Sequence, residues 1–187
     1  KPNKVNLQYF ELSNGSESIH LGTYFSGQMS IHHAIVTIKH SSFSASKSDD
    51  GLNIKNASIS VINSRFTGNL GDQFDCDYCV GEVENNYFEG LIEDTSSGDG
   101  TDGLDVSGSN VSVSKNKFKG FSDKAISVGE RSSVKIDANS IMTSNIGIAV
   151  KDSSIAELSN NSFHNNVQDV TEYIKKLMYS DPTVIYK

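Results

Sequence analysis

The chain has 187 residues, of which 36% are hydrophobic, and carries a formal net charge of −7 with a pI of about 5.1. This length predicts one domain. The acidic balance argues against general nucleic-acid binding, because no basic stripe is present to neutralise phosphates. No apolar run approaches the length that crosses a bilayer, so we expect no membrane insertion.

The first 25 residues show apolar pairs but no regular repeat. Val5/Leu7 and Ile19/Leu21 are such pairs, and they predict an irregular first coil over residues 1–25. The chain starts with Lys-Pro-Asn rather than Met and shows no signal peptide. We therefore expect a processed chain or a piece of a longer protein, with other domains of that parent protein as partners.

From residue 26 a core pattern returns about every 22 residues. The large apolar markers of this pattern are Phe43, Phe66, Phe88, Phe118, Ile141 and Phe163, and Ser or Asn stands two positions before each. A fixed short period indicates a solenoid, and this one leaves room for three short strands and no helix. The sequence predicts an all-β fold, a right-handed parallel β-helix of about seven coils, with residues 26–170 forming the regular coils.

Two further columns of apolar residues keep the same register. The first contains Leu52, Phe74, Leu104, Ile126 and Ile148, each followed two residues later by Ile54, Cys76, Val106, Val128 and Val150. The second contains Val36/Ile38, Ile59/Val61, Gly81/Val83, Val111/Val113, Val134/Ile136 and Ala156/Leu158. Spacing by two is typical of strands with one face inward, and stacking about 4.8 Å apart predicts Phe on Phe and Asn on Asn.

Two segments break the repeat. Glu89–Thr101, rich in Gly, Ser and Asp, lengthens one interval and predicts a loop, either part of a binding surface or a tolerated insertion. Val170–Met178 has helical apolar spacing and predicts a capping segment, with residues 171–187 as cap and tail of the single domain 1–187.

The two cysteines form the sequence Cys76-Asp-Tyr-Cys79. A single CxxC is a weak signal for zinc or redox chemistry. Cys76 occupies an inward position between Ile54 and Val106, so we expect a buried apolar side chain.

Acidic residues gather beside the Leu52 column in three consecutive coils. Strand alternation puts Asp75, Asp77 and Asp105 on the outer face, with Asn53 alongside. Stacked carboxylates repel by about 1 kcal/mol or more per pair, and calcium would compensate this repulsion with oxygen ligands. We expect Asp75, Asp77, Asp105 and Asn53 to hold calcium, the alternative being a plain acidic face.

A second set of aspartates stands at the bend that enters each strand. These residues are Asp50, Asp72 and Asp102, and Lys124 holds the same position in the next coil. Aspartate readily accepts hydrogen bonds from neighbouring backbone N–H groups, so this set predicts turn capping. Asp72, Asp102 and Lys124 are also candidates for contacts with a substrate.

The chain resembles the parallel β-helix repeat proteins over about residues 26–170. The resemblance rests on Asp-Gly-Leu-Asn (residues 50–53) and Asp-Gly-Leu-Asp (residues 102–105) at the start of coils, and on Asn-x-Phe a strand later, as at residues 116–118. The group includes pectate-lyase-like polysaccharide lyases, alginate-epimerase-like enzymes and NosD-like periplasmic proteins. The Asp-Pro-His-Glu motif of the epimerases is absent, as are the hydrolase motifs Asn-Thr-Asp and Arg-Ile-Lys.

The resemblance implies two functions, which stay open. One is an extracellular or periplasmic lyase acting on an acidic polysaccharide, with Lys55 or Lys124 matching the base and His32, one coil before Lys55, as a second candidate. The other is a non-catalytic module that binds glycan or calcium. Asp77 would raise the pKa of Lys55, so an ordinary ion pair between these residues is the alternative to a catalytic role.

Overall fold

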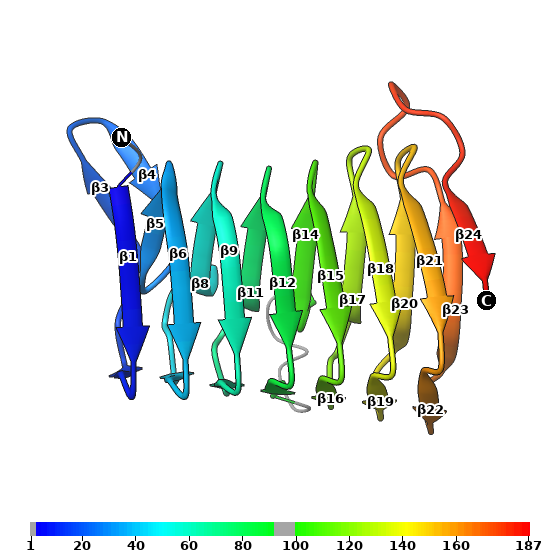
Figure 1. Cartoon of the computed structure of the whole chain (residues 1–187), viewed down its shortest axis with the longest axis horizontal. Coiled ribbons are helices and arrows are strands. Elements are labelled where there is room, and N and C mark those ends of the chain that lie inside the picture. Colours follow the sequence, from blue (N-terminus) through cyan, green and yellow to red (C-terminus); the bar gives the residue numbers. More distant parts are fainter. Residues whose placement is uncertain (1–2, 92–99) are drawn as a thin grey trace.

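The computed structural model describes residues 3–91 and 100–187 and shows a stack of parallel coils (Figure 1). One coil consists of β8 (Asp50–Lys55), β9 (Ser58–Ile62) and β10 (Arg65–Thr67). Asn56 and Asn63 join these strands with positive φ angles of 52° and 54°, a conformation that asparagine tolerates well. The expected all-β parallel β-helix is confirmed, and no helix occurs in the described residues.

Each complete coil contributes one strand to each of three parallel sheets, named I, II and III here. Sheet I contains β5 (Ser30–His32), β8, β11 (Asp72–Asp77), β14 (Leu104–Ser107), β17 (Lys124–Gly129), β20 (Ile146–Lys151) and β23 (Gln168–Tyr173). Sheet II contains β1 (Asn3–Gln8), β6 (Ala34–Lys39), β9, β12 (Val80–Glu84), β15 (Asn110–Ser114), β18 (Ser133–Asp137), β21 (Ile155–Ser159) and β24 (Thr183–Tyr186). Sheet III contains β2 (Glu11–Ser13), β7 (Ser42–Ser44), β10, β13 (Tyr87–Glu89), β16 (Lys117–Lys119), β19 (Ser140–Met142) and β22 (Ser162–His164).

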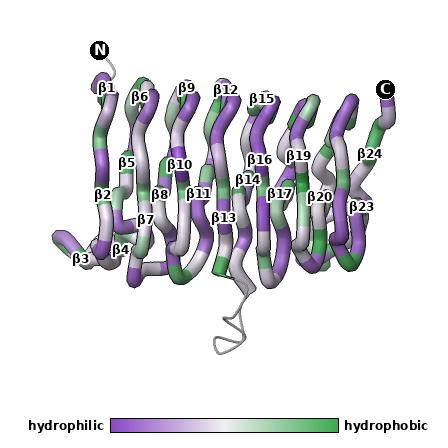
Figure 2. The backbone as a smooth tube through the Cα atoms, turned by 90° about the horizontal axis from the view of Figure 1, so that it is seen from below, coloured by the Kyte–Doolittle hydropathy of each residue, from purple (hydrophilic) through white to green (hydrophobic). Residues whose placement is uncertain are grey.

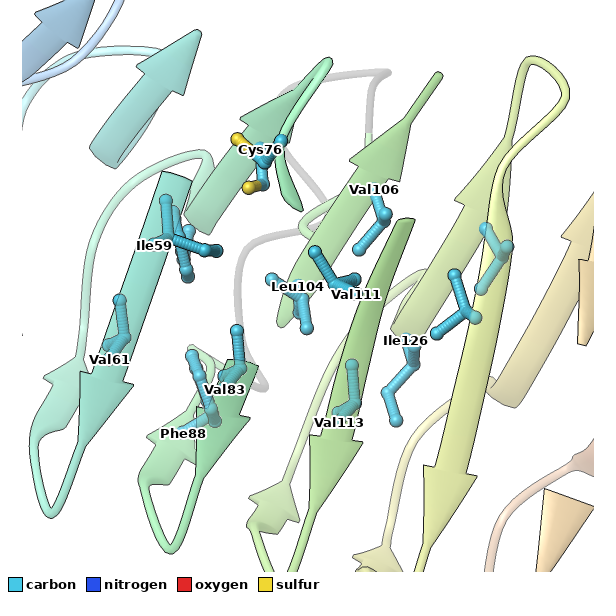
Figure 3. Packing of buried hydrophobic residues seen from close by; sticks show 14 of the residues in the cluster. Ile59, Val61, Cys76, Val83, Phe88, Leu104, Val106, Val111, Val113 and Ile126 are labelled. Carbon is cyan, nitrogen blue, oxygen red and sulfur yellow. The ribbon is translucent and has the colours of Figure 1, made fainter. Parts of the chain in front are cut away.

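The core runs as columns through the inside of the coils, as the sequence predicts. The rings of Phe66, Phe88 and Phe118 stack nearly parallel, with centroids 4.9 and 4.6 Å apart. Figure 3 shows Phe88 beside Val83 from the next sheet, and Leu104 beside Val111. Stacking of equal side chains lets each coil bury its apolar face against its neighbours, which is how a solenoid gains stability.

An asparagine ladder fixes one corner between sheets II and III. The amide of Asn116 donates to the carbonyl oxygen of Val83 at 2.9 Å, and its Oδ1 accepts from the backbone N–H of Asn86 at 2.8 Å. Asn139 repeats both contacts one coil later. Each side chain thus satisfies backbone groups of an earlier coil that the sharp corner leaves without strand partners.

The first coil is more regular than expected at its start and less regular at its end. Val5 and Leu7 of β1 pair with Val36 and Ile38 of β6, in the register of the regular coils. Ile19 and Leu21 are 74% and 93% exposed and lie in or beside the antiparallel hairpin of β3 (Ser18–His20) and β4 (Thr23–Phe25). The prediction that this second pair forms part of a coil is wrong.

The C-terminal segment continues the sheets. Val170, expected to begin a helical pattern, lies in β23 and pairs with Ile148 of β20, and β24 then adds to sheet II beside β21. The helical prediction is wrong because the open edge of β20 offers backbone partners to alternate residues of the incoming segment, and its apolar residues continue the core columns. The capping role of residues 171–187 stays a prediction.

Three further points concern the hydropathy pattern, membrane-spanning helices and the expected loop. Hydrophilic and hydrophobic stretches alternate along the coils, as strands with one buried face require (Figure 2). In the part of the chain that the structure describes, no helix is long and apolar enough to cross a membrane. Most of the expected loop Glu89–Thr101, namely residues 92–99, lies outside the described residues.

Candidate metal and glycan site

Six aspartates on or beside the outer face of sheet I form what we call the acidic row: Asp50, Asp72, Asp75, Asp77, Asp102 and Asp105. The strand register brings them together across three coils, with Asp72 beside Asp50 and Asp75 between Asn53 and Asp105. The expectation that these carboxylates share one region is confirmed by this register.

Three of the six carboxylates converge closely. Asp72, Asp102 and Asp105 each place one carboxylate oxygen so that the three oxygens lie within 4.8 Å of one another. The cluster shares only Asp105 with the expected ligand set of Asp75, Asp77, Asp105 and Asn53. It instead recruits two residues from the bends, whose side chains turn toward the strand face.

The two bend residues also cap backbone groups, as predicted. Oδ1 of Asp72 accepts from the backbone N–H of Asp102 at 2.8 Å, and Oδ1 of Asp102 accepts from the backbone N–H of Lys124 at 3.0 Å. These bonds fix the two carboxylates in place, each through one oxygen. Capping and a role in the cluster are therefore compatible.

Two buried oxygens beside the cluster lack hydrogen-bond partners within the described residues. They are Oδ1 of Asp105 and Oγ of Ser127, which lie on paired positions of β14 and β17. Ser127 is fully buried. A buried polar atom without a partner costs about 1–3 kcal/mol, so native structures rarely keep one that nothing satisfies. Both atoms are oxygens, the donor type that a hard divalent cation takes.

The acidic row is electrostatically costly without a counter-ion. Burial raises the pKa of Asp50 to about 6 and that of Asp102 to about 7; the charges of other aspartates add to this, while Lys124 opposes it for Asp102. Burial, and then the charges of neighbouring carboxylates, also raise the pKa values of Asp72 and Asp75 well above the usual range. Ionising all of these carboxylates at once therefore costs free energy. A bound cation would lower this cost by supplying positive charge.

Asn53 and Asp75 are engaged with each other. The amide of Asn53 donates to Oδ2 of Asp75 at 2.6 Å, and its Oδ1 lies 3.3 Å from Nε2 of His32. The His32 ring also packs against Phe25, with centroids 5.2 Å apart. His32 thus lies next to Lys55 in the sheet, as the spacing predicts, but its side chain belongs to a chain of contacts leading to Asp75.

Lys55 forms an ion pair with Asp77, which is the alternative to a catalytic role that the sequence predicts. Its Nζ lies 2.7 Å from Oδ2 of Asp77, and both side chains are partly exposed. Burial alone would lower the pKa of Lys55, but the hydrogen bond and charge of Asp77 outweigh it and raise the pKa. Lys55 is therefore held as a cation, which disfavours it as a proton-abstracting base.

Lys124 is buried against the cluster. Its Nζ lies 3.1 Å from Oδ1 of Asp102 and forms a second ion pair with Asp123. Burial acts to lower the pKa of Lys124, and the two carboxylates raise it overall. Lys124 is thus a fixed positive charge that offsets part of the cluster's negative charge.

Comparison with known proteins places the chain among solenoids. The profile of the family described as a right-handed beta helix region matches residues 21–174. The chain belongs to this right-handed β-helix family. The expected handedness is thereby confirmed, while the match names no activity and no ligand for the outer faces. None of the curated proteins matches the chain significantly.

Two solved structures are similar to this β-helix protein. The pectate lyase Pel9A aligns with a TM-score of 0.47 and 12% identity over 91% of this chain and 55% of the lyase. The chain therefore spans about half the length of that enzyme. HetL, a pentapeptide repeat protein involved in heterocyst differentiation regulation from the cyanobacterium Nostoc sp. strain PCC 7120, aligns with a TM-score of 0.23 and 12% identity over 89% of this chain and 86% of HetL.

Sequence reasoning missed Lys151 and Ser127 of this β-helix protein. Lys151 is only 5% exposed, and within the described residues its ammonium group forms no hydrogen bond or ion pair. It packs over Gly129, where an added Cβ would lie 3.4 Å from Lys151 Cε and 3.8 Å from Ser107 Oγ. The signal was available, because Lys151 holds the column position of Lys55 and Asp77.

Both cysteines lie in the core and contribute to packing and to a corner between strands. Cys76 and Cys79 are both fully buried, so the prediction for Cys76 is confirmed. The thiol of Cys79 contacts the carbonyl oxygens of Ile54 and Asp77 at 3.5 Å each. One coil later Ser109 makes the equivalent contacts, so Cys79 takes the place of a corner serine.

Proposed function

We propose that this β-helix protein binds an acidic polysaccharide, outside the cell or in the periplasm, through calcium held at the acidic row. The observation that carries the proposal is the convergence of Asp72, Asp102 and Asp105, together with two buried oxygens, Asp105 Oδ1 and Ser127 Oγ, that have no hydrogen-bond partner in the described part of the chain. Calcium takes six to eight oxygen ligands in flexible geometry, so it can accept three carboxylates, a hydroxyl and the carboxylate of a uronic acid.

The residues present fit such an ion. Asp72, Asp102 and Asp105 would hold it, with Ser127 as a neutral ligand, and Lys124 would keep Asp102 oriented through their ion pair. The bound cation would supply positive charge that draws a polysaccharide carboxylate to a surface of net charge −7. Magnesium is the weaker candidate, because it demands near-ideal octahedral geometry and keeps its waters.

Calorimetry with calcium tests this proposal directly. Wild-type protein should bind calcium, and polygalacturonate should then bind in calcium but more weakly in EDTA. Asp105→Asn removes one ligand charge and should weaken calcium binding at least about tenfold, as the loss of one charged ligand interaction of about 1.5–3 kcal/mol implies. Asp181→Asn makes the same charge change at an exposed site and should bind as wild type.

Two results would count against the proposal. One is the absence of calcium heat with the wild-type protein. The other is equal weakening by Asp105→Asn and Asp181→Asn, which would show that net charge rather than the cluster governs binding.

A lyase activity is the second candidate function, and Lys151 favours it. In a β-elimination a base removes the C5 proton of a uronate while the C4–O bond breaks, leaving an unsaturated end. Lys55 and Lys124 form ion pairs with carboxylates, whereas Lys151 is buried on the same sheet and forms no ion pair with any residue that the structure describes. We therefore propose Lys151 ahead of Lys55 and His32 as the base of such a reaction.

The activity assay compares single variants on polygalacturonate with calcium. Absorbance of new unsaturated ends should appear with wild-type protein and with Lys55→Ala, and should disappear with Lys151→Ala while calcium affinity is retained. Activity that persists in Lys151→Ala and vanishes in Lys55→Ala would restore Lys55 as the base. Wild-type protein without turnover would leave the binding function and remove the catalytic one.

A further inference from the structure

A second row of chemically suited side chains follows the outer face of sheet III, on another side of the solenoid. Arg65, Tyr87 and Lys117 occupy paired positions on β10, β13 and β16. The Arg65 guanidinium lies 4.3 Å from the centroid of the Tyr87 ring, and Lys117 Nζ lies 5.9 Å from it. One aromatic ring is thus flanked by a cation from each neighbouring coil.

Both cations are exposed and lack ion pairs within the described residues. Nearby charges are accounted for in pairs: Glu89 binds Lys119 at 2.8 Å and Glu84 binds Lys115 at 2.7 Å. Arg65 and Lys117 are therefore two exposed positive charges outside these pairs, about 10 Å apart across two strand spacings, with Glu89 as the nearby carboxylate. On a chain of net charge −7, these two cations and the Tyr87 ring between them form a local positive feature of the surface.

A pocket adjoins the row at Arg65. It encloses about 370 Å³ and is lined by Tyr9, Glu11, His40, Ser41, Ser42, Asn63 and Arg65. The rings of Tyr9 and His40 stack with centroids 5.2 Å apart and planes 9° from parallel. Tyr9 is 78% exposed, so this flat aromatic pair presents itself to solvent at the corner between sheets II and III.

The combination suits a sugar that carries an anionic group. A stacked aromatic pair offers a flat apolar surface for a sugar ring, while Glu11, Ser42 and Asn63 offer hydrogen-bond partners to hydroxyl groups. Arg65 presents a planar fork that matches a carboxylate or sulfate in a bidentate way. A purely apolar ligand would leave these polar groups without partners.

We propose that Tyr9, His40, Arg65, Tyr87 and Lys117 form a second binding site, for an acidic oligosaccharide, that needs no metal ion. One sugar ring packs on Tyr9 and His40, its anionic group binds Arg65, and a later anionic group of the same chain binds Lys117. This site is independent of the proposed function, since it uses another sheet and no calcium. A protein with both sites would cross-link acidic polysaccharide chains.

Oligogalacturonate titrated in EDTA isolates the second site, because chelation silences any calcium-dependent binding. Wild-type protein should bind, and the affinity should fall as salt rises. Arg65→Gln/Lys117→Gln should weaken binding by about one hundredfold, since it removes two charge-assisted contacts that are each worth about tenfold. Tyr9→Ala should weaken it as well, through the lost ring contact.

Lys4→Gln/Lys135→Gln is the matched control, because it also removes two positive charges, from exposed lysines on sheet II, away from the row. It should bind as wild type. No binding in EDTA, or equal loss in Lys4→Gln/Lys135→Gln, would overturn the proposal, as would single-stranded DNA binding as tightly as the oligosaccharide. Equal melting temperatures for all variants exclude unfolding as the cause of lost binding. Calcium binding unchanged in Arg65→Gln/Lys117→Gln would separate this site from that of the acidic row.

Discussion

Single residues in this solenoid act through the coil above and the coil below. Phe88 illustrates this, because its fully buried ring stacks on Phe66 at 4.9 Å and on Phe118 at 4.6 Å. Phe163, near the C-terminal end, is only partly buried. A core residue in the middle of the stack therefore packs against two neighbouring coils. A core residue near an end buries less of its side chain.

Phe88→Ala should lower the free energy of unfolding by about 3–5 kcal/mol, because neighbouring rings held in rigid coils cannot close the cavity. Leu21→Ala is the control, since Leu21 is 93% exposed and its truncation should change stability by less than about 0.5 kcal/mol. Denaturant unfolding monitored by circular dichroism measures both. A loss below about 1 kcal/mol for Phe88→Ala would contradict the stacked core.

Gly81 is a residue whose backbone, rather than its packing, decides its identity. It stands where other coils have Ile59 or Val111, yet its φ is +143° and an added Cβ would lie 1.9 Å from the carbonyl oxygen of Ile59. Gly81→Ala should therefore lower the free energy of unfolding by about 1–3 kcal/mol through backbone strain. If the variant and the wild-type protein unfold at the same denaturant concentration, the backbone at Gly81 does not require glycine.

At the scale of elements, the sequence predicts the strand register and the gathering of the six aspartates, but not which three carboxylates converge. The apolar columns fix which strands pair, because a slip by one residue would expose the core face of a strand. Asp72 and Asp102 were predicted to cap turns, and they do. That they also reach Asp105 depends on how each bend enters its strand, which the spacing does not contain.

Two element-level errors have one physical cause. Val170–Met178 satisfies a helical spacing and Ile19/Leu21 a strand spacing. However, the first segment begins in β23, which pairs with β20, and the second lies at an exposed hairpin. Local patterns carry no information on which backbone edge is free to receive a segment. Lys151 was overlooked for a related reason, since its burial is set by neighbouring coils and not by its own strand.

The acidic row should make stability depend on pH in a particular direction. Folding raises the pKa of Asp50 to about 6 and that of Asp102 to about 7, from a reference value of 3.8. Between pH 4 and 7 the folded protein thus holds more protons than the unfolded chain, so the free energy of unfolding falls as pH rises through this window. In EDTA, we expect a loss of at least about 1 kcal/mol between pH 5 and pH 8.

Denaturant unfolding at the two pH values measures this loss. Asp72→Asn removes one of the repelling carboxylates and keeps an oxygen to accept from the N–H of Asp102, so it should reduce the pH dependence. Asp181→Asn should leave the dependence as in wild type. Stability that rises between pH 5 and pH 8 in EDTA would show that the row is ionised at little cost.

For the whole molecule, a cation bound between coils should stabilise the stack and not only its own strands. Asp72 belongs to β11, Asp105 to β14 and Ser127 to β17, so one ion would join three successive coils of sheet I. Stability in a solenoid is close to a sum of coil and interface terms. An ion bound there would stabilise the two coil–coil interfaces on either side of β14. These interfaces lie in the middle of the solenoid, so the ion should raise the stability of the whole stack.

Calcium should accordingly raise the melting temperature of the wild-type protein. At a concentration one hundred times the dissociation constant, binding to the folded state adds about 2.7 kcal/mol, which for a chain of this size corresponds to about 5–10 °C. The rise should be larger above pH 7 than at pH 5, because fewer protons then compete with the ion for the carboxylates. Asp105→Asn should lose most of the rise and Asp181→Asn none of it. A melting temperature that is independent of calcium at pH 8, or a rise of equal size in Asp105→Asn, would mean that the cluster holds no ion and that the acidic row has another counter-charge.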